Sequence, residues 1–423
     1  MEYGKLGKDN RHRLTCIAMI TKIRVESFKS LEEVDINLGQ VNVFIGANGS
    51  GKSNLLEAIG VLGAAAFGRV DDEALLRRGV RPGVPQLYKS SFPRKPVENV
   101  PHIFFGAEND DAAYEVSLWN PLRDPKPAWG YKTEALRRAN GERIVGRSPY
   151  RRENIHPGQA LNRQQGYAAL KSVELKDGDP ARGLLDLLRG YAIYCANTPT
   201  LRGLSQDQQL REPLGLSGGR LPEAILELLR ARFEKDNEWL RAKVDEILPL
   251  IDWAKSFGSA PSASVPLSPS AAASQRVVRF TDRYMAEKRN VLTGYDASEG
   301  ALYILFGAVL TLHPKSPQFF AIDNLDQAMN PLLAKRLAEA LCRWTLESKT
   351  ARQVLMTAHN PAVLDGLPLK DERVWLFTVD RDNRGHTLVK RVELSDALLA
   401  KAAEGWTLSR LWVNGLIGGV PNV

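Results

Sequence analysis

The sequence of 423 residues predicts an α/β protein with a mostly parallel sheet flanked by helices, split by a largely helical insertion. First, residues 41–45 (VNVFI) are a short continuous apolar run of the kind found in buried parallel strands. Second, a glycine-rich loop and a helical segment follow this run directly. Third, strand and helix patterns alternate again after residue 276, whereas residues 126–275 have a different character. Such alternation is typical of a parallel sheet covered by helices.

Local patterns indicate the expected elements in order along the chain. Residues 20–28 alternate apolar and polar side chains, as in a half-buried strand, and residues 54–66 have helical composition. Two short strands are expected within residues 103–119, and apolar residues at three-to-four spacing predict a long helix through 221–250. Further strands are expected at 318–322, 354–357 and 374–379, and further helices at 301–312 and 331–345.

Four regions follow from these patterns. They are a flexible N-terminal extension at 1–18, a first half of the α/β domain at 19–125, a mainly helical insertion at 126–275 and a second half at 276–423. Within the insertion, the Ser/Pro/Ala-rich stretch at 258–274 is interpreted as a linker or mobile loop.

Composition limits the class of protein. Hydrophobic residues make up 43% and charged residues 25%, so the chain can bury a sizeable core. A formal charge of +8 and a pI of about 9.3 favour anionic partners such as nucleotides or nucleic acid. The cysteines, Cys16, Cys195 and Cys342, are too few and too widely spaced for a disulfide framework or a zinc site. Because no apolar run reaches membrane-spanning length, we expect a cytoplasmic protein without a membrane partner.

The strongest motif lies between the strand at 41–45 and the helix at 54–66. It fits G-x-x-x-x-G-K-[ST] and consists of Gly46, Ala47, Asn48, Gly49, Ser50, Gly51, Lys52 and Ser53. Its glycines allow backbone N–H groups to surround phosphate oxygens, and the following helix directs its positive end at the same anion. Lys52 adds charge at the β- and γ-phosphates, and the Ser53 hydroxyl binds magnesium. The motif therefore predicts ATP and Mg²⁺ as cofactors.

Two further candidate residues follow buried strands. Asp323 ends the apolar run at 319–322, which is the layout of a Walker B element, and is expected to hold magnesium through its water shell. His359 follows the next strand, with one helix between it and Asp323, which suits a sensor of the γ-phosphate. Because the carboxyl ends of parallel strands share one edge of a sheet, both residues are expected beside the P-loop.

The order P-loop, long insertion, Ser-Glu-Gly, Walker B and histidine resembles the ABC-type ATPase heads of the RecF, SMC and OLD families. The sequence is most similar to stand-alone prokaryotic ATPases of the AAA15/AAA21 type. Other shared marks are Phe28-Lys29-Ser30 after the first strand, Asp326 and Asn330-Pro331 after Asp323, and the tail at residues 412–421. The resemblance implies that Lys29 lies near the nucleotide.

The same resemblance implies a homo-oligomer with ATP held between two heads. Ser298 and Gly300 stand at the position of the ABC signature and would face the γ-phosphate bound by a second subunit. The N-terminus of the helix that follows supplies the physical reason. Residues 216–220 (LSGGR) also look like a signature, but we interpret them as a decoy, because far more than one helix and a turn separate them from Asp323.

One position departs from these families. Asn324 stands where a Glu usually follows the Walker B Asp and polarises the attacking water. An amide orients water by hydrogen bonding but cannot accept its proton. Slow hydrolysis is one expected outcome, with Asp326 assisting, and a switch held in the ATP state is the other. The predicted catalytic set is Lys52, Asp323, Asn324, Asp326 and His359.

Two features of the sequence are each open to two interpretations. Gln86 is a candidate for the magnesium-sensing glutamine of ABC heads, and an ordinary loop glutamine is the alternative. The arginines of residues 137–153 form a solvated loop in the favoured interpretation, and they follow a phosphate backbone in the other.

Three functions are compatible with these features. By resemblance, the leading one is an ATPase subunit of a prokaryotic anti-phage system that controls a separate effector protein, for which a nuclease is one candidate. The second is a DNA-repair or chromosome-clamping ATPase of RecF or SMC character, which would bind nucleic acid. The third is a non-hydrolysing, ATP-dependent assembly scaffold, motivated by Asn324. An ABC transporter motor is disfavoured, since those heads lack so large an insertion.

Overall fold

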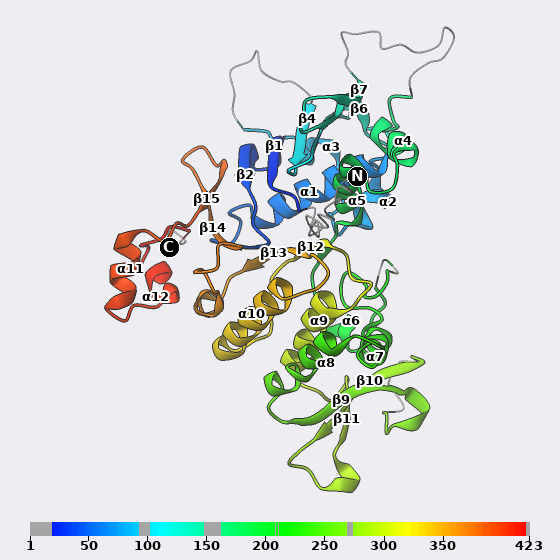
Figure 1. The fold of residues 1–423 in the computed structure, drawn as a ribbon, viewed down its shortest axis with the longest axis vertical. Coiled ribbons are helices and arrows are strands. Elements are labelled where there is room, and N and C mark those ends of the chain that lie inside the picture. Colours follow the sequence, from blue (N-terminus) through cyan, green and yellow to red (C-terminus); the bar gives the residue numbers. More distant parts are fainter. Residues whose placement is uncertain are drawn as a thin grey trace, which may run out of the picture.

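The structure, a computed structural model, describes residues 19–92, 102–147, 162–207, 209, 211–268 and 274–419. The predicted extension at residues 1–18 lies outside these ranges. Figure 1 shows the described chain extended along one axis, with an antiparallel sheet at each end and a mostly parallel sheet between them. Among the described helices, none combines the length and the apolar character needed to cross a bilayer.

The central sheet contains the predicted parallel strands. Its order is β15-β14-β3-β13-β12-β8, and all neighbours pair in parallel except β14 and β15. The strands are β3 (Val41–Ile45), β8 (Ile193–Tyr194), β12 (Phe319–Ile322), β13 (Gln353–Ala358), β14 (Val374–Arg381) and β15 (Thr387–Arg391). Every residue of β3, β12 and β13 is buried, as expected for a sheet covered on both faces.

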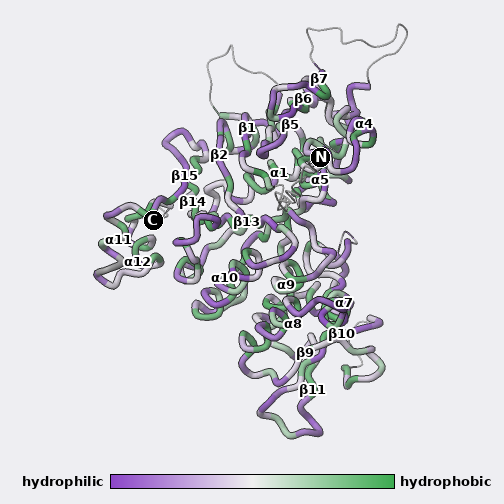
Figure 2. The backbone as a smooth tube through the Cα atoms, in the orientation of Figure 1, coloured by the Kyte–Doolittle hydropathy of each residue, from purple (hydrophilic) through white to green (hydrophobic). Residues whose placement is uncertain are grey.

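Alternate residues of β12 face two separate hydrophobic cores. Phe319 and Ala321 belong to the core that contains α1 (Lys52–Phe67) and α5 (Pro180–Gly190). Phe320 and Ile322 belong to the core that contains α9 (Glu299–Leu312) and α10 (Pro331–Leu346). Figure 2 shows hydrophobic and hydrophilic residues alternating along α10, as expected for a helix with one face on the sheet. The predicted α/β class is therefore confirmed.

An antiparallel sheet, in the order β2-β1-β4-β5-β6-β7, packs against α1. Its strands are β1 (Lys22–Phe28), β2 (Leu31–Asn37), β4 (His102–Glu108), β5 (Ala112–Trp119), β6 (Gly130–Arg138) and β7 (Arg143–Arg147). The prediction that a helical insertion begins at residue 126 is wrong, because β6 and β7 continue this sheet. Tyr131 and Leu136 of β6 are buried in the core that contains α1, and this burial outweighs the polar composition of the segment.

The arginine-rich stretch at 137–153 is not a solvated loop where the structure describes it. Arg138 of β6 forms two hydrogen bonds of 2.8 Å with the carboxylate of Asp179. Arg147 of β7 is buried, and its guanidinium lies 4.1 Å from the ring centre of Tyr167. These arginines therefore fasten the sheet edge to neighbouring helices, while residues 148–153 lie outside the described ranges.

The predicted long helix at 221–250 is divided in the structure. Its parts are α7 (Leu221–Ala231), α8 (Glu238–Asp245) and a 3-10 turn, η2 (Leu248–Leu250). Asp236 lies between the two helices with φ of 65°, and a residue in this left-handed region interrupts a right-handed helix. Pro249 removes a backbone donor in the last turn. Apolar spacing alone does not reveal these interruptions.

A third sheet replaces part of the predicted linker at 258–274. It has the order β11-β10-β9, with β9 (Ala254–Pro261), β10 (Arg276–Asp282) and β11 (Val291–Thr293). Backbone pairing with β10 holds the small residues of β9 in place, so residues 258–261 are strand. Pro261 stands at the end of this edge strand, where proline is tolerated. Residues 269–273 lie outside the described ranges.

Short helices complete the described chain. They are α2 (Asp72–Leu76), α3 (Pro85–Tyr88), α4 (Tyr167–Glu174), α6 (Thr198–Leu201), η3 (Ser262–Ser264), η4 (Glu287–Arg289), η5 (Pro361–Gly366), α11 (Asp396–Ala403) and α12 (Leu408–Val413). The last two form the red unit of Figure 1, where α12 packs against η5. The carboxyl ends of β3, β12 and β13 meet at one edge of the central sheet, which positions the site described next.

Candidate nucleotide-binding site

The loop between β3 and α1 requires glycine. Gly49 and Gly51 have φ of 76° and 114°, in the left-handed region that favours residues without a Cβ. At Gly51 a Cβ would also lie 2.1 Å from Oγ1 of Thr387. This hydroxyl lies 2.7 Å from both the carbonyl oxygen of Ser50 and Oγ of Ser30, which fastens the loop to its surroundings. The loop is thus held at the N-terminus of α1, where a helix favours anions.

Lys52 places a buried cation inside this loop. Only 5% of the residue surface is exposed. Its Nζ donates to the carbonyl oxygens of Gly46 and Ala47, at 2.7 and 3.0 Å. Burial lowers the pKa of Lys52 to about 8, although Asp323 and Asp326 oppose this effect. Because a buried cation held by neutral carbonyls gains from a neighbouring anion, the loop is suited to phosphate.

The pKa of Lys52 predicts how ATP binding depends on pH. A phosphate beside Nζ favours the charged amine, so the pKa is higher in the complex than in the free protein. Above pH 8 binding then requires uptake of a proton, and ATP affinity is expected to fall by about tenfold per pH unit. Calorimetric titration with ATP at rising pH measures this decline. Lys52→Arg keeps its charge and should remove the decline; an equally steep decline in this variant would assign it to another group.

Two neighbouring strand ends supply oxygen atoms beside the loop. Asp323 follows β12, and Thr357 lies in β13, its parallel neighbour. The Ser53 hydroxyl donates to Oδ2 of Asp323 at 2.9 Å, and the Thr357 hydroxyl donates to Oδ1. Hydroxyl and carboxylate oxygens suit Mg²⁺, which otherwise takes phosphate oxygens and water. These donors fit a cation shared with a phosphate.

Asn324 and His359 contact each other at the same edge. Oδ1 of Asn324 lies 3.0 Å from Nε2 of His359, and the Asn324 N–H donates to Oγ1 of Thr357 at 2.8 Å. Asn324 has φ of 57°, a conformation that asparagine adopts more easily than glutamate. Burial, and next the charge of Lys52, lower the pKa of His359, which favours the neutral ring. The predicted sensor histidine therefore contacts Asn324, and the role of Asn324 in place of a catalytic glutamate stays a prediction.

Asp326 holds the histidine segment in place. Its Oδ2 accepts hydrogen bonds from the N–H groups of His359, at 3.0 Å, and Asn360. Its Oδ1 is buried without a hydrogen-bond partner among the described residues. Asp326 is thus a positioning residue for His359 in this structure, and its assistance in hydrolysis stays a prediction.

The surroundings of Lys29 contain residues that sequence reasoning missed. Nζ of Lys29 is paired with the carboxylate of Glu57, a buried residue one turn along α1 from Ser53. Glu57 also binds Nε of Arg81, and Nη2 of Arg81 donates to Oδ1 of Asn54 at 3.2 Å. Burial lowers the pKa of Lys29, although Glu57 opposes this effect. The sequence signal for Glu57 was its i, i+4 spacing from Ser53, which places both residues on one face of the helix. A contact of Lys29 with the nucleotide stays a prediction.

A cavity of about 270 Å³ opens beside Ser53 and Asp323, and we call it the nucleotide cavity. Its other walls include residues 79–82, Cys195, Asp207 and Ser217. The predicted decoy at 216–220 therefore lines the cavity of its own copy. Oδ2 of Asp207 accepts hydrogen bonds from the N–H groups of Ser217 and Gly219, at 2.8 and 3.1 Å. These amides are already paired, so they are not free for a phosphate held by another copy.

Three predicted residues make no contact with Ser53 or Asp323 among the interactions of the described chain. Ser298 is exposed at the N-terminus of α9, and its side chain forms no capping hydrogen bond. Gly300 is buried, and a Cβ there would lie 2.9 Å from Cδ2 of Leu333. Gln86 is exposed in α3. Their roles toward nucleotide and metal stay predictions.

Two family models match the halves that carry these residues. The AAA_15 model, described as an AAA ATPase domain, matches residues 19–78 and includes the P-loop. The AAA_21 model, described as an AAA domain, putative AbiEii toxin, Type IV TA system, matches residues 220–365 and includes Asp323 and His359. Both are ATPase domains, so they support ATP binding and ATPase activity in general.

Curated relatives match over short segments. The DNA replication and repair protein RecF of Corynebacterium jeikeium is 40% identical over 62 residues, which are 14% of this chain and 15% of the relative. RecF of Halothermothrix orenii is 41% identical over 71 residues, which are 16% of this chain and 19% of the relative. The chain thus matches less than a fifth of the length of these two relatives.

A solved structure decides the fold. An Smc head bound to the C-winged helix domain of ScpA has a TM-score of 0.51 with this chain at 13% identity, covering 90% of this chain and 99% of that one. The chain has the fold of an ABC-type ATPase head. With the two ATPase domain models and the RecF matches, this confirms the resemblance to RecF/SMC-like heads. In this ABC-type head the P-loop, Asp323 and His359 lie at one sheet edge, as predicted.

Proposed function

We propose that this ABC-type head holds ATP and Mg²⁺ between two copies and uses slow hydrolysis to control a separate effector protein in anti-phage defence. The observation that carries the proposal is the 3.0 Å contact between Asn324 and His359, at the position where the resemblance to ABC-type heads implies a glutamate. Without a base at this position the ATP state lasts longer. A long-lived state is what a switch for a partner protein requires.

The residues at the sheet edge have separate tasks. Lys52 and the N-terminus of α1 hold the β- and γ-phosphates, while Ser53 and Asp323 hold the cation. Magnesium neutralises charge on the phosphate oxygens. Asn324, oriented by His359, orients the attacking water through its amide but does not remove the proton. The Oδ2 atom of Asp326 is occupied by main-chain N–H groups, so this oxygen is not free to take the proton in place of a glutamate.

A second copy is proposed to close the site through Ser298. Its exposed hydroxyl is not used as a cap by its own helix, α9, which has 14 residues. This leaves the hydroxyl and the positive helix end available to a γ-phosphate on the other copy. Behind it, Gly300 lies close to Leu333 and to the carbonyl oxygen of Ala328. The contact between copies would therefore be transmitted to the segment that follows Asp323.

Replacing Ser298 by arginine is expected to abolish ATP-dependent association of two copies, because a long cation would occupy the space of the γ-phosphate. ATP binding to the single copy should persist, since Ser298 makes no contact with the P-loop of its own copy among the described interactions. Sedimentation velocity with and without ATP and Mg²⁺ measures the association. Ser264→Arg, an exposed serine near the end of β9, is the matched control. Undiminished association of Ser298→Arg would contradict the sandwich.

The effector is proposed to be a separate protein. A solved head of this fold is bound to a domain of ScpA, so heads of this fold take protein partners. Tagged protein purified together with the products of neighbouring genes tests the proposal, with Lys52→Ala as the control. Co-purification of a neighbour, and phage resistance that Lys52→Ala abolishes, are expected. No partner and no phage phenotype would count against an effector role.

The RecF matches favour one alternative, a DNA-repair or chromosome-clamping ATPase. Such a protein would bind DNA with an affinity that falls steeply with salt, because phosphate contacts release counterions. DNA-stimulated ATP turnover together with this salt dependence would favour the alternative. Turnover equal to that of Lys52→Ala would instead favour a non-hydrolysing assembly scaffold.

A further inference from the structure

A second cavity, of about 280 Å³, lies at the opposite end of α1 from the P-loop. Five arginines and the acidic residues Asp71 and Glu73 line it, together with Phe67, the last residue of α1, and we call it the arginine pocket. The arginines are Arg69, Arg77, Arg78, Arg189 and Arg211. Nothing in the proposed ATPase cycle uses this cavity, so its concentration of positive charge requires a separate explanation.

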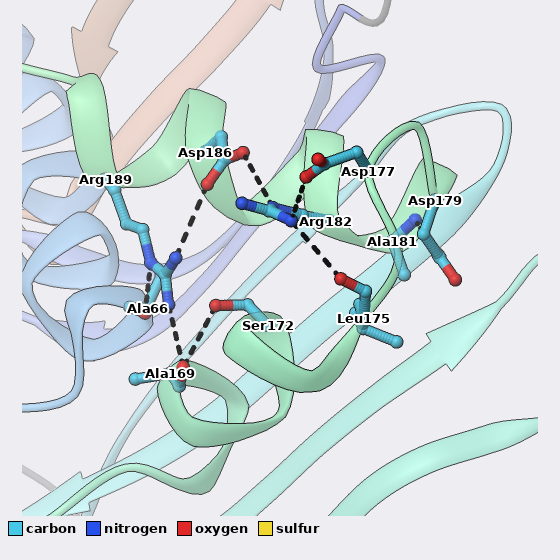
Figure 3. A network of polar contacts seen from close by, with 10 residues as sticks. All are labelled: Ala66, Ala169, Ser172, Leu175, Asp177, Asp179, Ala181, Arg182, Asp186 and Arg189. Carbon is cyan, nitrogen blue, oxygen red and sulfur yellow. Dashed lines mark hydrogen bonds and ion pairs between the residues drawn. The ribbon is translucent and has the colours of Figure 1, made fainter.

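Structural bracing explains part of this charge. Figure 3 shows Arg189 between Ala66 of α1, Ala169 of α4 and Asp186 of α5. Its side chain donates to these three residues at 3.1, 3.3 and 3.4 Å. Arg69 and Arg77 are likewise paired with carboxylates, those of Asp71 and Glu73 respectively. These three arginines therefore have partners that account for their charge.

Arg78 and Arg211 are different, because neither has a carboxylate partner among the described residues. Arg78 donates to the carbonyl oxygens of Ala74 and Arg189, at 2.9 and 3.3 Å. Arg211 donates to the carbonyl oxygens of Arg77 and Gly190, at 3.2 and 2.6 Å. Carbonyl groups orient a guanidinium but do not neutralise it. Neither of these two cations is therefore neutralised by a direct ion pair among the described residues.

The surrounding fold fixes the position of the Arg78 side chain. Its residue surface is only 5% exposed, and its Nε has no hydrogen-bond partner within the described part of the chain. Gly63 of α1 makes room for it, because a Cβ there would lie 3.2 Å from that Nε and 2.4 Å from the carbonyl oxygen of Leu188. Burial, and next the charge of Arg211, lower the pKa of Arg78 to about 10. A bound anion would offset the cost of keeping this cation buried.

We propose that the arginine pocket binds a phosphorylated nucleoside, either a free nucleotide or the terminal nucleotide of a nucleic-acid strand. A guanidinium group can donate two parallel hydrogen bonds to phosphate oxygens, and Arg78 and Arg211 are cations without a described carboxylate partner. The Arg78 guanidinium lies 5.4 Å from the ring centre of Phe67, and the ring is 58% exposed at the same cavity, so its exposed surface suits stacking on a base. The cavity volume fits one nucleotide rather than an extended strand.

Two chain segments connect this pocket to the nucleotide cavity. In residues 76–81, Gly79 and Arg81 line the nucleotide cavity, whereas Arg77 and Arg78 line the arginine pocket. Asp207 lines the nucleotide cavity, and Arg211, four positions later in the sequence, lines the arginine pocket. Arg211 also joins the two segments by its bond to the Arg77 carbonyl. A ligand in the arginine pocket is therefore expected to change the affinity of the P-loop for ATP. This consequence rests on the proposed function, whereas binding of the ligand to the arginine pocket does not.

The binding experiment uses the full chain carrying Lys52→Ala, so that the P-loop contributes little. The probes are adenosine monophosphate, adenosine, and a short single-stranded DNA with either a 5′-phosphate or a 5′-hydroxyl. Affinity is measured for the parent, for Arg211→Gln and for Phe67→Ala. Arg230→Gln, an exposed arginine of α7 without a described ion pair, is the matched control. Arg211 is only partly buried, so its substitution tests the pocket without removing the buried Arg78.

The phosphorylated probes are expected to bind at least about tenfold more tightly than their unphosphorylated counterparts. Arg211→Gln should weaken them by roughly ten- to a hundredfold and Phe67→Ala by less, whereas Arg230→Gln should not change them. Tight binding of the monophosphate alone would identify a free nucleotide as the source, and tight binding of the 5′-phosphorylated DNA would identify a strand end. Absence of binding by both, or equal affinities in Arg211→Gln and Arg230→Gln, would overturn the proposal. Because Lys52→Ala already disables the P-loop, a failure of the proposed ATPase cycle would not alter this result.

Discussion

Replacing Lys52 by alanine is expected to weaken ATP binding by roughly a hundredfold or more. The ammonium is the buried cation of the P-loop, and the described loop offers no other side-chain cation within hydrogen-bond distance of the carbonyls of Gly46 and Ala47. The fold should survive, because those carbonyls can turn to water when Nζ is removed. The expected change in the free energy of unfolding is within about 1 kcal/mol. Calorimetric titration with ATP and chemical denaturation measure the two quantities.

Lys255→Ala provides the control for this result, since Lys255 is an exposed lysine of β9. It should leave both ATP affinity and stability unchanged. If Lys52→Ala bound ATP as tightly as Lys255→Ala, the nucleotide would have to lie elsewhere. A large loss of stability in Lys52→Ala would show instead that the lysine supports the fold rather than the ligand.

Replacing Asn324 by glutamate is expected to raise the rate of ATP hydrolysis by at least about a hundredfold, since a positioned general base contributes on the order of 10²–10⁴. The carboxylate would stand where the amide now meets His359 and could accept the proton of the attacking water. The same change should cost roughly 1 kcal/mol of stability, because residue 324 has φ of 57° and glutamate tolerates this conformation less well than asparagine. Phosphate release under single-turnover conditions measures the rate.

Asn324→Gln separates chemistry from backbone strain. Glutamine has the length of glutamate and the same difficulty with φ of 57°, but it offers no base. We expect it to lose similar stability and to gain no rate. Equal rates for Asn324→Glu, Asn324→Gln and the unmodified protein would mean that the asparagine serves the turn and does not slow hydrolysis.

The nucleotide site was largely predictable because its parts are local in the sequence. The strand, glycine loop and helix around Gly51 and Lys52 form one continuous unit, and the structure places them as expected. Asp323 and His359 each end a buried apolar run, and parallel strands bring such ends together. The contact of Asn324 with His359 needed the register of β12 and β13, which no local pattern supplies.

The surroundings of the site were less predictable because they depend on contacts between distant residues. Strands β6 and β7 are polar by composition and become strands through pairing with β5 and packing on α1. Glu57 belongs to α1 and Arg81 to a loop after α2, and only the fold shows that Lys29 and Arg81 both pair with Glu57. Asp207 is paired with amides of Ser217 and Gly219 across a turn that has no regular period. Each of these features is a tertiary contact rather than a local preference.

The most direct measurement is a structure of the protein with ATP and Mg²⁺ bound. We expect the triphosphate in the loop from Gly46 to Lys52, with the Ser53 hydroxyl and Asp323 directed at the cation and Ser298 of a second copy facing the γ-phosphate. A nucleotide bound elsewhere, or Asp323 turned away from the cation, would contradict this expectation.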